Sequence, residues 1–234
     1  MNKKVKEEIK KTEKLNNEKG ETKMESSKVK LNIATFSKVQ KEVGYNAIAV
    51  EKYPYINEDG EVVYEIHRMK NAEQPFYTVR PLGNGKYKSG LGKVKTIPYN
   101  LPNVLKAKED GDVIFVTEGE SKANVLNELG YVATTVPFKG IDKWTNKYNK
   151  YVKYAKVIIV VDNDENSKAF AENTFETISD VANKIGILEL SDIYPELKEG
   201  GDIEDLRNIV NDDNYLKEVL NSIIEDLTSD KEVE

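Results

Sequence analysis

The chain has 234 residues, of which 38% are hydrophobic and 32% charged, a length that suffices for one or two domains with hydrophobic cores. The sequence has no cysteine and no apolar run of the roughly 18 residues that a transmembrane helix needs, which excludes disulfides, thiol catalysis, Cys-type zinc sites and a membrane span. Residues 1–28 contain no apolar segment, so we expect no Sec signal peptide, no membrane partner and a cytoplasmic location.

The net charge of −6 is unevenly distributed along the chain. Residues 1–28 hold nine Lys and six Glu, so the remainder of the chain sums to −9. Residues 66–108 carry nine basic side chains against one acid. An acidic body with one basic segment predicts a polyanionic partner that docks beside an acidic site.

The first part of the chain predicts two charged tails and a small β-rich subdomain. Residues 1–28 and 229–234 are polar and are expected to be disordered. Residues 29–110 form the predicted basic subdomain, which begins with a short helix near residues 37–43. In it, "KYPYI" and "EVVYEIHRM" flank Asp59-Gly60, a strong hairpin signal, and "FYTVRPL" and "KYKSGLGKVKTIPY" supply further short strands.

After Gly111, predicted strands and helices alternate. We expect strands at "VIFV", "YVATTV", "KVIIVV" and "ILEL", and a helix at "ESKANVLNEL" that Gly130 ends. A second helix is predicted over residues 165–185, capped by Gly186, and a last one over about residues 214–227. This alternation predicts an α/β domain over residues 111–209, with a mostly parallel sheet of about four strands and flanking helices, followed by a C-terminal helix over 210–228.

Acidic side chains follow three of these predicted strands. Glu118 comes after "VIFV", Asp162 and Asp164 come after "KVIIVV", and Asp202 and Asp205 come after "ILEL". In open α/β sheets the strands' carboxyl ends carry the functional groups, so these acids are expected at one edge. Each like-charged pair at ~4 Å costs about 4 kcal/mol at an effective dielectric near 20, which favours a bound cation.

An all-oxygen ligand set favours Mg²⁺ or Mn²⁺, and Gly119 and Lys122 could contact a phosphate at the start of the next helix. The pattern therefore predicts metal-assisted phosphoryl transfer. Each motif alone has a simpler interpretation, because an Asp after a strand often caps a helix or forms a turn. The order of the motifs along the chain, more than any single motif, favours metal-assisted phosphoryl transfer over these simpler interpretations.

These motifs resemble the TOPRIM domain of DnaG-type primases, topoisomerases and certain nucleases. "VIFVTEGESKANVLNELGYVATT" and "KVIIVVDND" are similar to its two central motifs, and "GGDIEDL" is similar to the later acidic motif of the primase-like branch. "PFYTVRPLGNGKYKSGLGKVKTIPYNLPNVLKA" and "FKGIDKWTNKY" resemble primase-like proteins of phages and mobile elements. The resemblance implies a Rossmann-like TOPRIM fold and Mg²⁺-dependent nucleotidyl transfer in DNA replication.

The resemblance also implies roles for particular residues. Glu118, Asp162 and Asp164 would be catalytic, the same three with Asp202 would hold two Mg²⁺ or Mn²⁺ ions, and Asp205 is a weaker candidate. The implied partners are single-stranded DNA, nucleotides, and a separate helicase or replication protein. The candidate nucleic-acid-binding residues, with tyrosines for stacking on bases, are Arg68, Arg80, Lys86, Lys88, Tyr77 and Tyr87.

The sequence departs from the family in several places. It lacks the zinc-binding module, so no zinc is expected, and it has no GxxxxGK[ST] motif of a helicase motor. Ser167 and Asn100 stand where relatives tend to have Gly and Arg. A TOPRIM nuclease and a non-catalytic nucleic-acid-binding protein therefore remain alternatives. A dehalogenase-like phosphatase ranks last, because Asn166 occupies the position of its usual Thr or Val and Glu118 would have no role.

Overall fold

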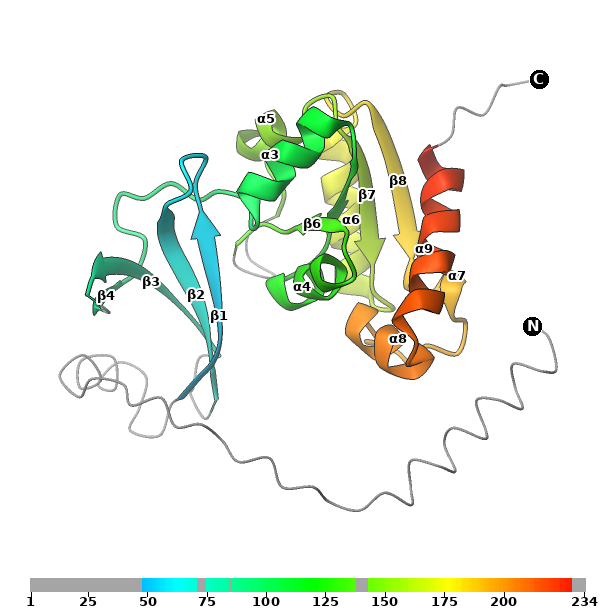
Figure 1. Ribbon diagram of the computed structural model, residues 1–234, viewed down its shortest axis with the longest axis horizontal. Helices are drawn as coiled ribbons and strands as arrows, with labels where there is room; N and C mark the ends of the chain where they lie inside the picture. The colour runs from blue at the N-terminus through cyan, green and yellow to red at the C-terminus, as the bar shows by residue number, and fades with distance from the viewer. Residues whose placement is uncertain (1–47, 71–74, 85, 138–142, 229–234) are drawn as a thin grey trace, which may run out of the picture. The chain divides into compact units, whose positions relative to one another are not determined.

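The computed structural model describes residues 48–70, 75–84, 86–137 and 143–228, which form two four-stranded sheets with associated helices (Figure 1). By their internal contacts all of the described residues belong to one compact unit. The predicted tails at 1–28 and 229–234 and the predicted helix near 37–43 lie outside the described residues. No helix within the described ranges combines the length and apolar character needed to cross a bilayer.

The first sheet is antiparallel, with the strand order β1-β2-β3-β4. Its strands are β1 (Ile48–Ile56), β2 (Val62–Lys70), β3 (Phe76–Gly83) and β4 (Lys86–Ser89). The predicted hairpin at Asp59-Gly60 is confirmed: Gly60 has φ 82°, and the Asn57 side chain accepts hydrogen bonds from the backbone of Asp59 and Glu61. Alternation along the strands buries one face, on which Tyr55 and Tyr64 stack with ring centroids 4.4 Å apart.

The second sheet confirms the predicted parallel arrangement of four strands. It has the order β6-β5-β7-β8, and all three neighbouring pairs are parallel. Its strands are β5 (Val113–Val116), β6 (Val132–Thr134), β7 (Lys156–Val161) and β8 (Lys184–Glu189). Residues 157–161 are all buried, because β7 lies between β5 and β8 and is covered on both faces.

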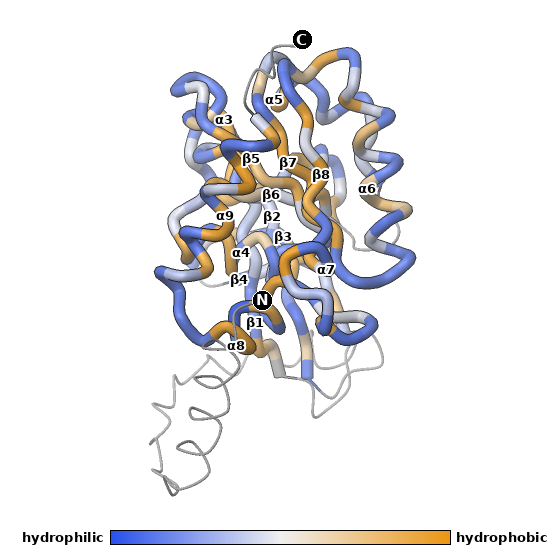
Figure 2. Tube along the Cα trace, turned by 90° about the vertical axis from the view of Figure 1, so that its right-hand side faces the viewer, coloured by the Kyte–Doolittle hydropathy of each residue, from blue (hydrophilic) through white to orange (hydrophobic). Residues whose placement is uncertain are grey.

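Helices cover this parallel sheet on both faces. In Figure 2, α6 lies on one side of the sheet, α3, α4 and α9 lie on the other, and hydrophobic residues concentrate along β5 and β7. Two further short helices lie at other points of the chain: α5 follows a 3₁₀ turn, and α7 follows β8 directly. The helices are α3 (Leu101–Asp110), α4 (Glu120–Glu128), η1 (Asn146–Tyr148), α5 (Asn149–Val152), α6 (Glu165–Ile178), α7 (Leu190–Ile193), α8 (Ile203–Val210) and α9 (Asp213–Thr228).

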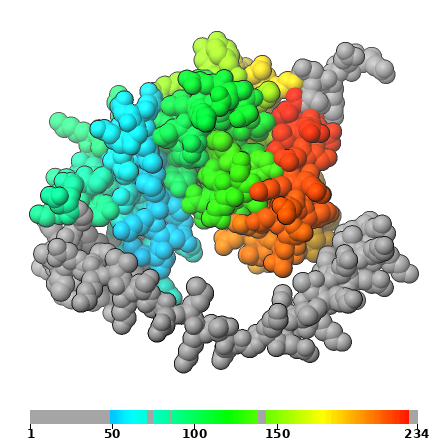
Figure 3. Space-filling model, in the orientation of Figure 1, coloured from blue at the N-terminus to red at the C-terminus, as the bar shows by residue number. Residues whose placement is uncertain are grey.

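The helix predicted over 165–185 is shorter in the structure, and this part of the prediction is wrong. α6 ends at Ile178, whose carbonyl accepts hydrogen bonds from Val181 and Ala182 in the following turn. Gly186 is not a helix cap and lies inside β8. A Cβ atom at Gly186 would stand 3.0 Å from Leu227, so the glycine lets α9 approach the strand closely. Figure 3 shows α8 and α9, in orange and red, side by side at the surface.

Candidate functional site

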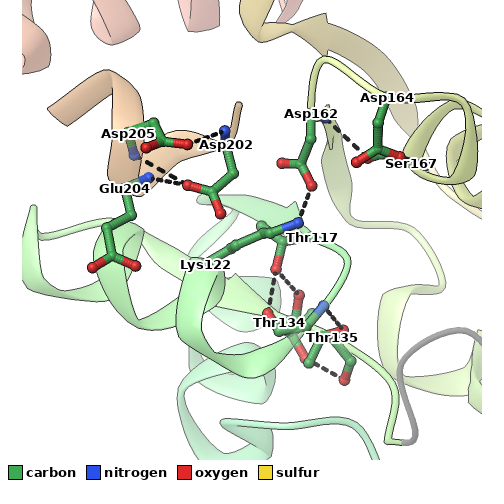
Figure 4. Close-up of polar contacts among 11 residues, drawn as sticks. Thr117, Lys122, Thr134, Thr135, Asp162, Asp164, Ser167, Asp202, Glu204 and Asp205 are labelled. Atoms are coloured by element: carbon green, nitrogen blue, oxygen red, sulfur yellow. Dashed lines mark hydrogen bonds and ion pairs between the residues drawn. The ribbon is translucent and has the colours of Figure 1, made fainter. Parts of the chain in front are cut away.

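The predicted acids come from three connections at the carboxyl ends of β5, β7 and β8. Glu118 follows β5, Asp162 and Asp164 follow β7, and Asp202 begins α8. Asp202 and Asp164 are close enough to Asp162 to raise its pKa by repulsion. The structure thus brings the four acids into one neighbourhood, which we call the acidic edge. Figure 4 shows the Lys122 nitrogen directed at the Asp162 carboxylate, with the Asp202 side chain beside this contact.

Lys122 and Asp162 form a buried ion pair at the centre of the acidic edge. Only 7% of the lysine side chain and 2% of the aspartate side chain are exposed. Burial raises the pKa of Asp162 to about 6, although Lys122 opposes this shift. For Lys122, burial lowers the pKa, but attraction to Asp162, Asp202 and Glu118 outweighs it and leaves the pKa raised. The pair is charged at neutral pH, because the pKa of Asp162 stays at about 6 and that of Lys122 is raised.

Asp164 and Ser167 fasten the start of α6 to the end of β7. Asp164 is the N-cap of α6, and its Oδ1 accepts a hydrogen bond of 2.8 Å from the Ser167 backbone. The Ser167 hydroxyl accepts a hydrogen bond of 2.9 Å from the Asp162 N–H. Ser167 therefore supports the backbone of Asp162. Asp164 serves the helix cap that the sequence offered as its simpler interpretation.

Asp202 and Asp205 form a capping box at the start of α8. Asp202 Oδ1 accepts hydrogen bonds from the backbone of Glu204 and Asp205, at 2.9 and 3.1 Å, and the Asp202 N–H donates to Asp205. Asp205 also pairs with the exposed Lys198 at 3.3 Å. Asp205 is therefore explained by helix capping, whereas Asp202 keeps its second carboxylate oxygen outside the cap.

Asn163, which the sequence reading did not single out, holds the loop before α8 against the end of β7. Its N–H donates to the Gly201 carbonyl at 2.9 Å, and its carbonyl accepts from the Gly200 N–H at 2.8 Å. Its side-chain amide donates to the carbonyls of Leu197 and Lys198, at 2.7 and 3.1 Å. These four hydrogen bonds place Asp202 beside Asp162. In the sequence, the only sign of this role is the position of Asn163 between Asp162 and Asp164. The loop that Asn163 binds lies more than 30 residues further along the chain, so the sequence does not show the contact.

Glu118 and Gly119 differ in how they are bonded. Glu118 is only 6% exposed, and within the described ranges its carboxylate has no hydrogen-bond partner. Gly119 adopts φ 102° as the N-cap of α4, and its N–H donates to the Thr135 hydroxyl at 3.0 Å. The predicted phosphate-binding groups at Gly119 and Lys122 are therefore both bonded within the protein, while Glu118 keeps its capacity to bind a ligand.

A further buried acid, Glu120, links α4 to the antiparallel sheet. Its carboxylate accepts a hydrogen bond of 2.7 Å from the hydroxyl of Tyr55 on β1. Burial and the Glu120 charge raise the pKa of the Tyr55 hydroxyl well above its usual range. Both side chains are buried, so this bond connects the two sheets at the first turn of α4, one residue after Gly119. The sequence predicted Glu120 only as part of a helix start.

The acidic edge as arranged does not fit the two-ion site that the sequence predicts. Among the residues that the structure describes, no three acid or histidine side chains converge closely enough to hold an ion. The Lys122 ammonium group is paired with the carboxylate of Asp162, and helix capping uses one carboxylate oxygen each of Asp164 and Asp202. A protein ammonium group thus neutralises part of the charge that a metal ion was expected to neutralise.

The predicted nucleic-acid-binding residues lie on two opposite faces of the antiparallel sheet. Arg80 on β3 lies opposite Lys88 on β4 in the strand register, and the exposed Arg68 lies on the same face of the sheet. Because side chains alternate along β4, Lys86 is on this face too. The register places Tyr77 opposite His67 and Tyr87 opposite Pro81, on the other face. The six residues do not form one stacking and phosphate-binding track, because neighbouring residues in a strand point to opposite sides.

Several of these side chains also have partners within the protein. Arg68 pairs with Glu51 at 3.1 Å, and Arg80 donates to the Gly90 carbonyl at 2.7 Å. Tyr87 donates to Glu65, which also bonds the single histidine, His67, at 2.6 Å. Lys86 and Lys88 are exposed. Of the six predicted residues, the exposed basic side chains are therefore Arg68, Lys86 and Lys88.

A cavity of about 410 Å³ lies between β1, α4 and α8. Its lining is polar and mixed in charge, and Arg207 is bonded to Glu128 and to Asp213. The cavity shows no excess of positive charge for a phosphate. Its lining residues are Glu51, Lys52, Tyr53, Ser121, Asn124, Val125, Glu128, Glu204, Arg207 and Asn208.

The two sheets and the acidic edge define a mixed α/β protein whose polar groups gather at the carboxyl ends of parallel strands. Two solved structures share this fold. The Aquifex aeolicus primase (zinc-binding and RNA polymerase domains) has a TM-score of 0.55 and 17% identity, covering 82% of this chain and 49% of that one. A DNA primase domain from Pseudomonas aeruginosa has a TM-score of 0.51 and 16% identity, covering 72% and 50%.

These similarities concern the fold. No protein-family profile matches the chain, and no curated protein matches it. The chain spans about half the length of each of the two solved primase structures. The fold of primase catalytic domains is thus present over most of this chain, in agreement with the primase-like fold expected from the sequence.

Proposed function

We propose that this chain is a primase-like nucleotidyltransferase that joins nucleotides on a single-stranded DNA template during replication of a phage or mobile element. The observation that carries the proposal is the acidic edge, where Glu118, Asp162, Asp164 and Asp202 lie in one neighbourhood at the carboxyl ends of parallel strands. That edge lies in a fold shared with primase domains, and the sequence resembles the TOPRIM motifs. A helicase or another replication protein would be supplied by a separate chain.

Glu118 is the residue of this edge best placed to act on a ligand. Glu118 is 6% exposed, and its carboxylate makes no hydrogen bond within the described part of the chain while its oxygens are not enclosed, so it can accept a proton or orient a nucleotide hydroxyl without breaking an existing contact. Phosphoryl transfer depends mainly on positioning and on stabilisation of charge. The proposal includes a requirement for Mg²⁺ or Mn²⁺, which chelation tests directly.

The test is synthesis of oligonucleotides by the full chain on single-stranded DNA with labelled nucleotides and Mg²⁺ or Mn²⁺. Glu118→Gln is a more specific test than Asp162→Ala, because the Glu118 carboxylate has no hydrogen-bond partner in the described structure. Loss of Asp162, by contrast, would leave the buried Lys122 charge without its ion-pair partner. We expect synthesis to vanish in Glu118→Gln and with chelator. Asp192→Ala, which removes an exposed acid from α7, is the matched control and should retain activity.

Two other outcomes would contradict the proposal. Metal-dependent shortening of the DNA strand, lost in Glu118→Gln, would instead assign a nuclease. Salt-sensitive DNA binding without turnover, unchanged in Glu118→Gln, would assign a non-catalytic binding protein. The Lys122–Asp162 ion pair favours this second alternative over the nuclease, because it already neutralises part of the acidic edge without a metal.

A further inference from the structure

The segment of residues 143–156 carries five lysines and four aromatic residues and has no acidic residue. It contains η1 and α5 and leads into the amino end of β7, whereas the acidic edge lies at the carboxyl ends of the strands. Figure 1 shows α3 and α5 at the opposite end of the parallel sheet from α7 and α8. This basic, aromatic segment is therefore separate from the acidic edge.

Three lysines of the segment each hold the ammonium group over the ring of the tyrosine that follows. The distances from Nζ to the ring centroid are 4.7, 4.4 and 4.8 Å for the pairs Lys147–Tyr148, Lys150–Tyr151 and Lys153–Tyr154. Lys150 also pairs with Glu58 at 3.3 Å, but both side chains are more than half exposed, so this ion pair is weak and easily exchanged. In the described part of the chain Lys153 pairs with no carboxylate. These ammonium groups therefore remain available to an anion.

Tyr154 occupies a position of the backbone that favours glycine. Residues 152–155 form a β-turn in which the Ala155 N–H donates to the Val152 carbonyl at 3.0 Å, and Lys153 has φ −60° and ψ 125°, typical of a type II turn. The next position of such a turn needs a positive φ and is usually Gly or Asn, yet Tyr154 stands there with φ 65°. Tyr154 is 72% exposed, so packing of its ring does not offset the strain. The other three aromatic residues of the segment are buried. An exposed ring on a strained backbone indicates a binding role.

We propose that Tyr154, Lys150 and Lys153 form a binding surface for single-stranded nucleic acid, separate from the acidic edge, on which the Tyr154 ring stacks on a base and the two ammonium groups contact neighbouring phosphates. Lys153 lies over one face of the ring, which leaves the other face for a base. The surface uses none of the carboxylates of the acidic edge. The inference thus goes beyond the proposed function and does not depend on nucleotide transfer.

The exposed ring decides which polyanion fits this surface. Lysine charge alone attracts any polyanion, including an acidic peptide or a DNA duplex. Unpaired bases offer their ring faces to an aromatic side chain, whereas the bases of a duplex are stacked on one another and an acidic peptide has no such rings. Stacking on aromatic side chains beside cations that follow the backbone is the usual way in which proteins bind single strands.

The test is binding of a fluorescein-labelled oligothymidylate to the full chain, measured by fluorescence anisotropy at several salt concentrations. Tyr154→Gly relieves the strained turn, so it should melt no lower than the wild type and yet bind about fivefold to a hundredfold more weakly. Lys150→Gln/Lys153→Gln should lower the slope of log affinity against log salt by about 1.4, the value for two phosphate contacts on a single strand. Tyr215→Ala is the matched control, because it removes a 53% exposed tyrosine of α9, and its affinity should stay within about twofold.

A second measurement on the wild type does not depend on any variant. An oligonucleotide that carries 5-iodouracil cross-links on irradiation to an aromatic residue stacked on the base, and mass spectrometry should find the adduct at Tyr154. A melting temperature of Tyr154→Gly several degrees lower, unchanged affinity in this variant, or cross-links only at other residues would each overturn the inference. A duplex or an oligoglutamate that competes as strongly as the single strand would overturn it too. If the surface binds as expected but no oligonucleotide is made, the proposed function fails and this inference stands.

Discussion

Replacing Asn163 with alanine tests whether this residue positions the two halves of the acidic edge. The change removes two side-chain hydrogen bonds to the carbonyls of Leu197 and Lys198 and leaves both backbone bonds of residue 163 in place. A net hydrogen bond contributes about 0.5–1.5 kcal/mol, so Asn163→Ala should lower the free energy of unfolding by about 1–3 kcal/mol. For a domain of this size the melting temperature should fall by about 2–4 °C per kcal/mol.

The assay is urea unfolding followed by the fluorescence of Trp144, the single tryptophan, which is 1% exposed. Hydrogen exchange of the Gly200 amide, which donates to the Asn163 carbonyl, reports separately on the loop and should accelerate. Asn166→Ala is the matched control, because Asn166 is exposed in the first turn of α6. A stability within about 0.5 kcal/mol of the wild type, with unchanged Gly200 exchange, would refute the positioning role.

Two further predictions concern the antiparallel sheet. Tyr55→Phe removes the hydrogen bond to the buried Glu120 and should lower the free energy of unfolding by about 1.5–3 kcal/mol in urea, whereas an unchanged value would show that the bond adds nothing. Burial raises the pKa of Glu65, but hydrogen bonds from His67 and Tyr87 outweigh it and leave the pKa below its usual 4.5. The resulting stabilisation relative to Glu65→Gln should be present above pH 4.5 and disappear below it, and a difference that grows on acidification would contradict the assignment.

Local sequence patterns predicted the architecture because they reflect burial. The uninterrupted run "KVIIVV" indicated a strand covered on both faces, and β7 is the strand between β5 and β8. Asp59-Gly60 located a hairpin for a different local reason, because Gly60 readily adopts the positive φ that the turn requires. The pattern failed after Ile178, where Ala182 and Ile185 continue the helical spacing but lie in a turn and in β8. Apolar spacing alone does not separate a longer helix from a helix followed by a buried strand.

The composition of the candidate site was partly predictable, and its bonding was not. The rule that parallel strands present their carboxyl ends at one edge placed Glu118, Asp162 and Asp202 together. The pairing of Lys122 with Asp162 depends on a contact across 40 residues of sequence, which no local pattern contains. The division of the basic segment between two faces depends on the register of β3 and β4. Side-chain pairing and register are tertiary properties, so they emerge only from the folded chain.

The bond between Tyr55 and Glu120 bears on how the protein unfolds. Tyr55 and Tyr64 belong to the same buried cluster as the hydrophobic residues of β5 and β7, and the only oxygen of the Tyr55 side chain is bonded to α4. Separating the antiparallel sheet would therefore expose aromatic surface and leave a buried carboxylate without this donor. The two sheets should melt in a single transition, and a fragment that begins at residue 111 should be much less stable than the whole. The acidic edge is in this way stabilised by a sheet that carries none of its carboxylates.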